Sequence, residues 1–87
     1  MDNQKPVKFS HHALEQLNYR GTSQEEIVET INHGAWENAE LGRSECRKDF
    51  AYNKDWNGKH YKTKQVRPIF VEEPNAIEIV TVYVYYF

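Results

Sequence analysis

Residues 77–87, IEIVTVYVYYF, decide the fold class. β-branched and aromatic side chains dominate this segment, which favours an extended strand. Val80, Val82 and Val84 occupy alternate positions and suit packing beneath helices, while the odd-numbered positions form a second row that carries hydroxyl groups. A strand used on both faces is usually central in its sheet. We therefore expect an inner strand that is covered by helices on one face.

Between Gly34 and this segment, the sequence pattern has the two-residue period of β-strands. Short connections rich in turn residues, including the hairpin dipeptide Asn57-Gly58, separate the segments and favour an antiparallel meander. Pro68 cannot donate to a sheet ladder, which indicates an edge, a bulge or an irregular start in its strand. The predicted strands are AWENAEL (35–41), SECRKDFAY (44–52), KHYKTKQVRPIFVEE (59–73) and IEIVTVYVYYF (77–87).

Two helices are expected before Gly34. Ser10 is a suitable N-cap for the first, which Gly21 ends. Thr22 followed by Glu25 has the spacing of a capping box that opens the second helix, and Gly34 is expected as its left-handed C-cap. The predicted fold is α+β, with two N-terminal helices packed on one face of a three- to four-stranded antiparallel sheet. The apolar stripes comprise Ala13, Leu14 and Leu17 in the first helix, and Ile27, Val28 and Ile31 in the second.

Length and composition indicate one domain over residues 1–87. Hydrophobic residues make up 39% and charged residues 28% of the 87 residues, a globular balance that argues against disorder. There is no apolar run near the roughly 20 residues that span a bilayer, and the polar N-terminus lacks the core of a signal peptide. Cys46 is the single cysteine, so no internal disulfide can form. Together these features predict a cytoplasmic protein without a membrane segment.

The net charge of −2 conceals an uneven distribution. Residues 1–42 carry a net charge of −4, residues 43–68 carry +5, and residues 69–87 carry −3. A basic middle segment can bind a polyanion locally even in an acidic chain. A set of solvated strand faces would produce the same pattern.

The first helix carries the candidate acid–base group. His12, Gln16 and Arg20 lie four residues apart and share one stripe beside the apolar one. The first turn of a helix favours a neutral imidazole, which can accept a proton. The alternative is that His12 is only a polar surface residue, as first-turn histidines frequently are. His11 shares its stripe with Glu15 and is expected to face solvent.

Several other chemistries are disfavoured. The histidines and Cys46 show no paired spacing such as HxxxH or CxxC, so no metal site is expected. Cys46 has no identifiable base near it in sequence, and neither a glycine-rich phosphate loop nor a GxSxG motif is present. We expect no cofactor.

The remaining groups suit metal-independent RNA cleavage, which needs a base for the 2′-hydroxyl, donors for the phosphorane and an acid for the leaving oxygen. Thr81 and Tyr83 could donate to phosphate oxygens, and Tyr61 or Tyr83 could stack on an unpaired base. Ordinary strand composition would also explain these residues. The cationic candidates for phosphate contact are Arg43, Lys64 and Arg67.

A family resemblance adds to this interpretation. The ordered segments FSHHA, YRGTSQEEIVETINHG, GKHYKTKQVRPI and IVTVYVY resemble the small prokaryotic proteins grouped as domain of unknown function 4258, over residues 8–85. That family is similar in layout to the RelE-like toxin fold of metal-independent ribonucleases. The resemblance implies that His12 is the acid or base. It implies Arg67 and Lys64 as the phosphate cradle, Thr81 and Tyr83 as supporting donors, and Arg20 as a phosphate ligand or a structural residue.

Two functions therefore remain open. The first is an endoribonuclease that acts as the toxin of a toxin–antitoxin pair, with RNA and a cognate antitoxin as partners. The second is a non-catalytic protein-binding or regulatory module, which the tyrosine-rich tail VYVYYF (82–87) would serve. A DNA-binding regulator is disfavoured because the exposed side of the second helix is acidic.

Overall fold

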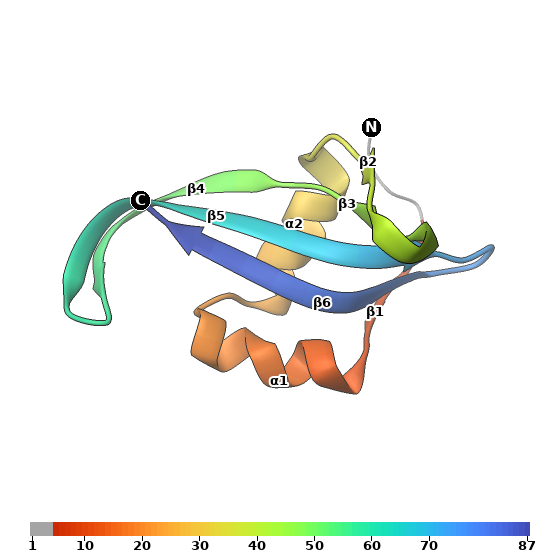
Figure 1. Cartoon of the computed structure of the whole chain (residues 1–87), viewed down its shortest axis with the longest axis horizontal. Helices are drawn as coiled ribbons and strands as arrows, with labels where there is room; N and C mark the ends of the chain where they lie inside the picture. The colour runs from red at the N-terminus through yellow and green to blue at the C-terminus, as the bar shows by residue number, and fades with distance from the viewer. Residues whose placement is uncertain (1–4) are drawn as a thin grey trace.

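The computed structural model describes residues 5–87, which form two helices and six strands in one mixed sheet (Figure 1). The elements in chain order are β1 (Val7–Phe9), α1 (His11–Arg20), α2 (Gln24–His33), β2 (Glu37–Asn38), the 3-10 turn η1 (Glu40–Gly42), β3 (Ser44–Glu45), β4 (Lys48–Trp56), β5 (Lys59–Glu72) and β6 (Ile77–Tyr86).

The predicted architecture of two N-terminal helices on a three- to four-stranded antiparallel, RelE-like sheet is wrong. The fold is α+β, but β1 precedes both helices and pairs in parallel with the start of β6, so the sheet is mixed. The strand order is β1-β6-β5-β3-β2, and β4 also pairs with β5. β1 has only three residues and too little alternation to be recognised as a strand, and its partner lies about 70 residues later in the chain.

The helix boundaries follow local capping, with two corrections. Ser10 caps α1 by accepting a hydrogen bond from the amide of Ala13, as predicted, and Gly21 ends the helix at φ 77°. The N-cap of α2 is Ser23 instead of Thr22, whose hydroxyl donates to the Glu26 carboxylate. Gly34 is extended, at φ −78°, and not left-handed. A Cβ at that position would lie 2.8 Å from the Thr30 carbonyl oxygen, which explains the glycine by crowding.

A bulge in β6 changes which positions of the strand are buried, from odd-numbered residues before the bulge to even-numbered residues after it. Ile69 pairs with Thr81, but Phe70 pairs with Ile79, so Val80 is the additional residue. Ile79 is therefore buried before the bulge and Val82 after it, although the alternation of the sequence placed them on opposite faces. The predicted valine row under the helices holds for Val82, whereas Val80 is only partly buried.

The hairpin between β4 and β5 is longer than predicted. The segment 53–58 was expected to be a connection, but β4 continues to Trp56 and the turn is confined to Asn57 and Gly58. The predicted strand over 35–41 is reduced to β2 and is followed by η1, in which Leu41 has a φ of 61°. The predicted strand over 44–52 is interrupted at residues 46–47, because Cys46 turns into the core.

The core lies between the helices and one face of the sheet. In Figure 1, α2 crosses behind the sheet and α1 runs beside β6. Leu14 was expected in the core but is 42% exposed. Among residues 5–87, no α-helix packs on the opposite face of β5 and β6, and the segment from β2 to β3 lies over part of it (Figure 1). The buried cluster comprises Ala13, Ile27, Ile31, Cys46, Val66, Phe70, Ile77, Ile79 and Val82.

Within residues 5–87, neither helix has the length and apolar character needed to cross a membrane. Residues 1–4 lie outside the described residues. They belong to the N-terminal segment that is predicted to lack a signal peptide.

Candidate active site

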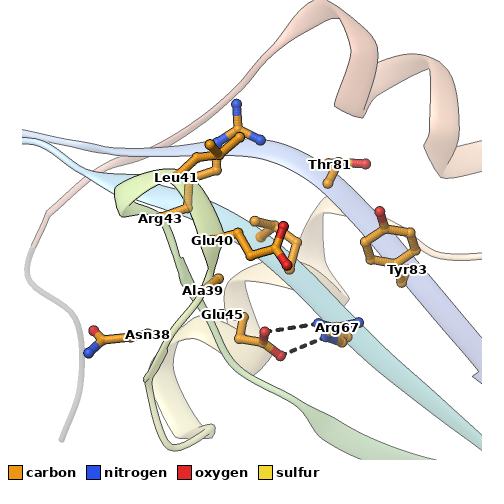
Figure 2. Close-up of a pocket in the computed structure, with 10 residues that line it drawn as sticks. Asn38, Ala39, Glu40, Leu41, Arg43, Glu45, Arg67, Thr81 and Tyr83 are labelled. Carbon is orange, nitrogen blue, oxygen red and sulfur yellow. Dashed lines mark hydrogen bonds and ion pairs between the residues drawn. The ribbon is translucent and has the colours of Figure 1, made fainter.

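A cavity of about 540 Å³ lies on the face of the sheet that the helices leave uncovered (Figure 2). Strands β3, β5 and β6 form its floor, and the segment from β2 to β3 forms one wall. Arg43, Arg67, Thr81 and Tyr83, four residues that the sequence proposed separately, all line it. The other lining residues are Asn38, Ala39, Glu40, Leu41, Glu45 and Ile69.

Strand register explains why these side chains meet. Arg67 pairs with Tyr83 and Ile69 pairs with Thr81, so the four side chains share one face of two neighbouring strands. Glu45 pairs with Ile69 on the other side of β5 and thus joins the same face. The bulge at Val80 sets this register, because it keeps Thr81 and Tyr83 on the open face while Ile79 remains in the core.

Arg67 is the most constrained residue of the cavity. Its Nε donates to Glu45 Oε2 at 2.6 Å and its Nη2 donates to Glu45 Oε1 at 2.9 Å, which is a bidentate pair (Figure 2). Its Nη1 also donates to the Tyr85 hydroxyl at 3.0 Å. The hydrogen bonds from Arg67 lower the pKa of Glu45, and those to Glu45 raise the pKa of Arg67. Both groups are therefore fully ionised at neutral pH.

Tyr83 lies near two guanidinium groups. The Cζ atom of Arg67 is 5.3 Å from the ring centroid, and that of Arg20 on α1 is 5.5 Å from it. The Nε of Arg20 is buried and has no hydrogen-bond partner among residues 5–87. Arg20 thus brings a second guanidinium group to Tyr83, from α1 instead of from the sheet.

Thr81 is tied to the first helix. The side-chain oxygen of Gln16, a residue only 3% exposed, accepts hydrogen bonds from the Thr81 hydroxyl and the Val82 amide, each at 2.8 Å. In the predicted stripe of His12, Gln16 and Arg20, the side chains of Gln16 and Arg20 therefore face β6. The sequence places Gln16 on that stripe but assigns it no role. Its position between His12 and Arg20 is the feature that indicates the contact with Thr81.

His12 lies one turn before Gln16 and does not line the cavity. Its side chain is exposed and makes no hydrogen bond, ion pair or ring contact with residues 5–87. His11 is 2.7 Å from the Glu15 carboxylate and faces solvent, as predicted.

Two further predicted residues also lie elsewhere. Lys64 is 7% exposed on the helix side of the sheet, where its Nζ is 2.8 Å from the Glu26 carboxylate and donates to the Gly21 carbonyl. Tyr61 belongs to an aromatic cluster around Tyr86, at a centroid distance of 5.8 Å.

Glu45 and Glu40 are the charged residues of the cavity that sequence reasoning missed. Glu45 was counted only as one acidic residue of a basic segment, and nothing local indicates that it pairs with Arg67, 22 positions away. Glu40 and Arg43 belong to the wall segment and form no ion pair with residues 5–87. The wall ends in Leu41, whose side chain is 84% exposed.

The charged side chains that line the cavity are two arginines and two glutamates, and two further arginines lie beside them. Arg43 and Arg67 line it, Arg20 contacts Tyr83, and Arg47 lies 3.7 Å from Glu45, against the two carboxylates Glu40 and Glu45. Residues 5–87 contain no group of three or more histidine, cysteine, aspartate or glutamate side chains arranged to hold a metal ion. Cations, hydroxyl donors and a carboxylate in one cavity are groups that can bind and polarise an anionic ester.

Comparisons with known proteins supply no relative, since no family model, curated protein or solved structure matches the chain significantly. The resemblance to domain of unknown function 4258 therefore stays a prediction.

Proposed function

We propose that the chain is a metal-independent endoribonuclease and that the cavity on the open face binds the scissile phosphate. The observation that supports this most is the convergence of Arg43, Arg67, Thr81 and Tyr83 on one cavity. Strands β5 and β6 and the loop before β3 supply these groups, so three separate segments of the chain bring them to one surface.

The chemistry assigns each group a role. The 2′-oxygen of the ribose attacks phosphorus, its proton passes to a base, and the bond from phosphorus to the 5′-oxygen breaks as an acid protonates that oxygen. The products are a 2′,3′-cyclic phosphate and a free 5′-hydroxyl. Arg43 and Arg67 stabilise the charge that develops on the phosphorane, and the hydroxyl of Tyr83 donates to its oxygens. Thr81 shapes the floor of the cavity, because its hydroxyl hydrogen is donated to Gln16.

The acid–base group has two candidates. His12 lies in the first turn of α1, outside the cavity and one turn before Gln16, which accepts a hydrogen bond from Thr81 on the cavity floor. Glu40 lies in the wall itself. The family resemblance favours His12, and a His12→Ala variant compared with a Glu40→Gln variant decides between them.

The test is cleavage of end-labelled single-stranded RNA in the presence of EDTA. The parent chain should produce fragments that end in a 2′,3′-cyclic phosphate. Arg43→Ala should cleave about 10²-fold more slowly, as expected when one transition-state donor is removed. Arg43 forms no ion pair with residues 5–87, and thermal unfolding of the variant separates a catalytic loss from a disrupted fold. Lys8→Ala, at an exposed pair with Glu73 away from the cavity, is the control. Absence of cleavage of any RNA by the folded parent would refute the proposal.

In a cell, this activity would fit the toxin of a toxin–antitoxin pair in the cytoplasm, with a cognate antitoxin that covers the cavity. The second candidate is a non-catalytic protein-binding module. The exposed aromatic residues Tyr85 (41%) and Phe87 (58%) at the end of the chain favour it. Capture of one protein partner by a chain that does not bind RNA would support this second function.

A further inference from the structure

The hairpin formed by the distal halves of β4 and β5 extends beyond the rest of the sheet (Figure 1). We call residues 53–63 the basic arm. Its lysines, Lys54, Lys59 and Lys62, are all exposed. Its one carboxylate, Asp55, lies 3.3 Å from His60 of the same hairpin. The arm is therefore a local surplus of positive charge in a chain whose net charge is −2.

The arm is held in place by aromatic packing. Trp56 stacks on Tyr86 of β6 with a centroid distance of 4.8 Å and an interplanar angle of 16°, and Tyr52 and Tyr61 pack around the same ring. The Tyr86 hydroxyl donates to the carbonyl of Arg20 at 2.7 Å, which connects the cluster to the end of α1. A hairpin anchored to the body in this way presents its lysines in a defined orientation.

Two of these lysines also lie near aromatic rings. The Nζ of Lys59 is 5.5 Å from the centroid of Tyr61, and that of Lys54 is 5.6 Å from the centroid of Tyr52. Cations interleaved with aromatic rings are the combination that binds single-stranded nucleic acid, because the cations contact phosphates and the rings can accept unpaired bases. An apolar partner would find few exposed apolar side chains on this arm.

We propose that the basic arm is a second RNA-binding surface that holds the single strand flanking the scissile phosphate. This inference rests on the proposed function and deepens it, because it defines the substrate as an extended single strand. Strand β5 connects the two surfaces: Lys59 and Arg67 lie eight positions apart, which corresponds to about 26 Å along a strand. A strand bound in the cavity would have to be several nucleotides long to reach the tip of the arm.

The test compares two variants of the full chain with equal changes in charge. The arm variant carries Lys54→Gln, Lys59→Gln and Lys62→Gln. The control carries Lys5→Gln, Lys8→Gln and Lys48→Gln, which lie outside the arm in ion pairs with Glu72, Glu73 and Glu29. Circular dichroism and thermal unfolding establish that both variants are folded.

The first measurement is binding of a labelled, 2′-O-methylated single-stranded RNA of about 16 nucleotides, a length at the upper end of single-strand site sizes. Because each phosphate contact contributes about 0.7 to the slope of log affinity against log salt, the arm variant should lower that slope by about 2. It should also bind roughly tenfold or more weakly at low salt. The control should retain the parent slope. Equal slopes and affinities for the arm variant and the parent would overturn the proposal.

The second measurement separates this proposal from the proposed function. The arm variant should cleave a dinucleotide at the parent rate and a long single strand more slowly, whereas Arg43→Ala should be slow on both. If the parent cleaves nothing but the arm variant still loses RNA binding, the catalytic proposal fails and the arm remains an RNA-binding surface. Slower dinucleotide cleavage by the folded arm variant would contradict a separate flanking site.

Discussion

At the scale of single residues, the pair between Glu45 and Arg67 is central to the cavity. Glu45 is 9% exposed and makes both of its strong hydrogen bonds to one guanidinium group. An ion pair of this kind contributes modestly to stability when complete, but losing one partner is costly because the other charge remains poorly solvated. Glu45 therefore positions Arg67, and the Tyr85 hydroxyl completes its orientation.

Glu45→Gln should lower the free energy of unfolding by about 2 kcal/mol at neutral pH, the range for hydrogen bonds to charged groups. In the parent, the pKa of Glu45 in the folded state lies below the ordinary value of 4.5. The contribution of the Glu45 carboxylate to stability is therefore present above that pH and is lost as the pH falls below it. The variant should accordingly lose less stability than the parent between neutral pH and pH ~3.

Urea unfolding at both pH values measures this difference. Glu15→Gln, which breaks the exposed pair with His11, is the control and should change stability by less than about 0.5 kcal/mol. Identical acid sensitivity of the Glu45→Gln variant and the parent would show that the pair contributes nothing to stability.

At the scale of elements, Gly21 couples the turn between the helices to the β4–β5 hairpin. It has a φ of 77°, which disfavours any residue with a side chain. A Cβ there would also lie 2.7 Å from Trp56 and would collide with the Tyr86 hydroxyl. Trp56 and Tyr86, which anchor the basic arm, therefore pack directly against the backbone of Gly21, where a side chain would not fit.

Gly21→Ala should destabilise the fold by more than about 2 kcal/mol, because it combines backbone strain with displacement of the aromatic cluster. Gly58→Ala is a matched control, since Gly58 has a similar φ of 82° but open space around it. The control should cost only about 1 kcal/mol. Thermal unfolding of the two variants gives the comparison, and equal losses would show that the contact with Trp56 and Tyr86 is unimportant.

At the scale of the whole molecule, β1 connects the two ends of the described chain. It pairs in parallel with Ile77–Ile79, and its residues Val7 and Phe9 pack against the core. The amide of Ser10 donates to the Ile79 carbonyl, which continues this connection into the N-cap of α1. The position of α1 beside β6 thus depends on a short strand outside the helical hairpin.

A chain that begins at Ser10 should therefore unfold at a lower temperature, because it loses two partly buried side chains worth roughly 1.5–3 kcal/mol each when fully buried. It should also self-associate at high concentration, since the edge of β6 at Ile77–Ile79 becomes free to pair. Thermal unfolding and analytical ultracentrifugation test both effects. A monomeric truncated chain with the parent melting temperature would refute this role of β1.

The features that the sequence predicts well depend on contacts between neighbouring residues. Ser10 and Gly21 mark α1 because capping involves contacts within four residues, and Asn57-Gly58 marks a turn because its backbone preferences are local. The chemical types of Arg67, Thr81 and Tyr83 indicate phosphate contact, and the structure brings all three to one cavity.

What only the tertiary structure decides depends on contacts between distant residues. The parallel pairing of β1, the bulge at Val80 and the ion pair of Lys64 with Glu26 have no local signature. Each depends on partners far away in the sequence that the packing of the whole chain selects, and a buried polar group such as Lys64 has to be paired within that packing. For the same reason the sequence could propose Arg67 as a cation, but only the fold determined that Glu45 holds it.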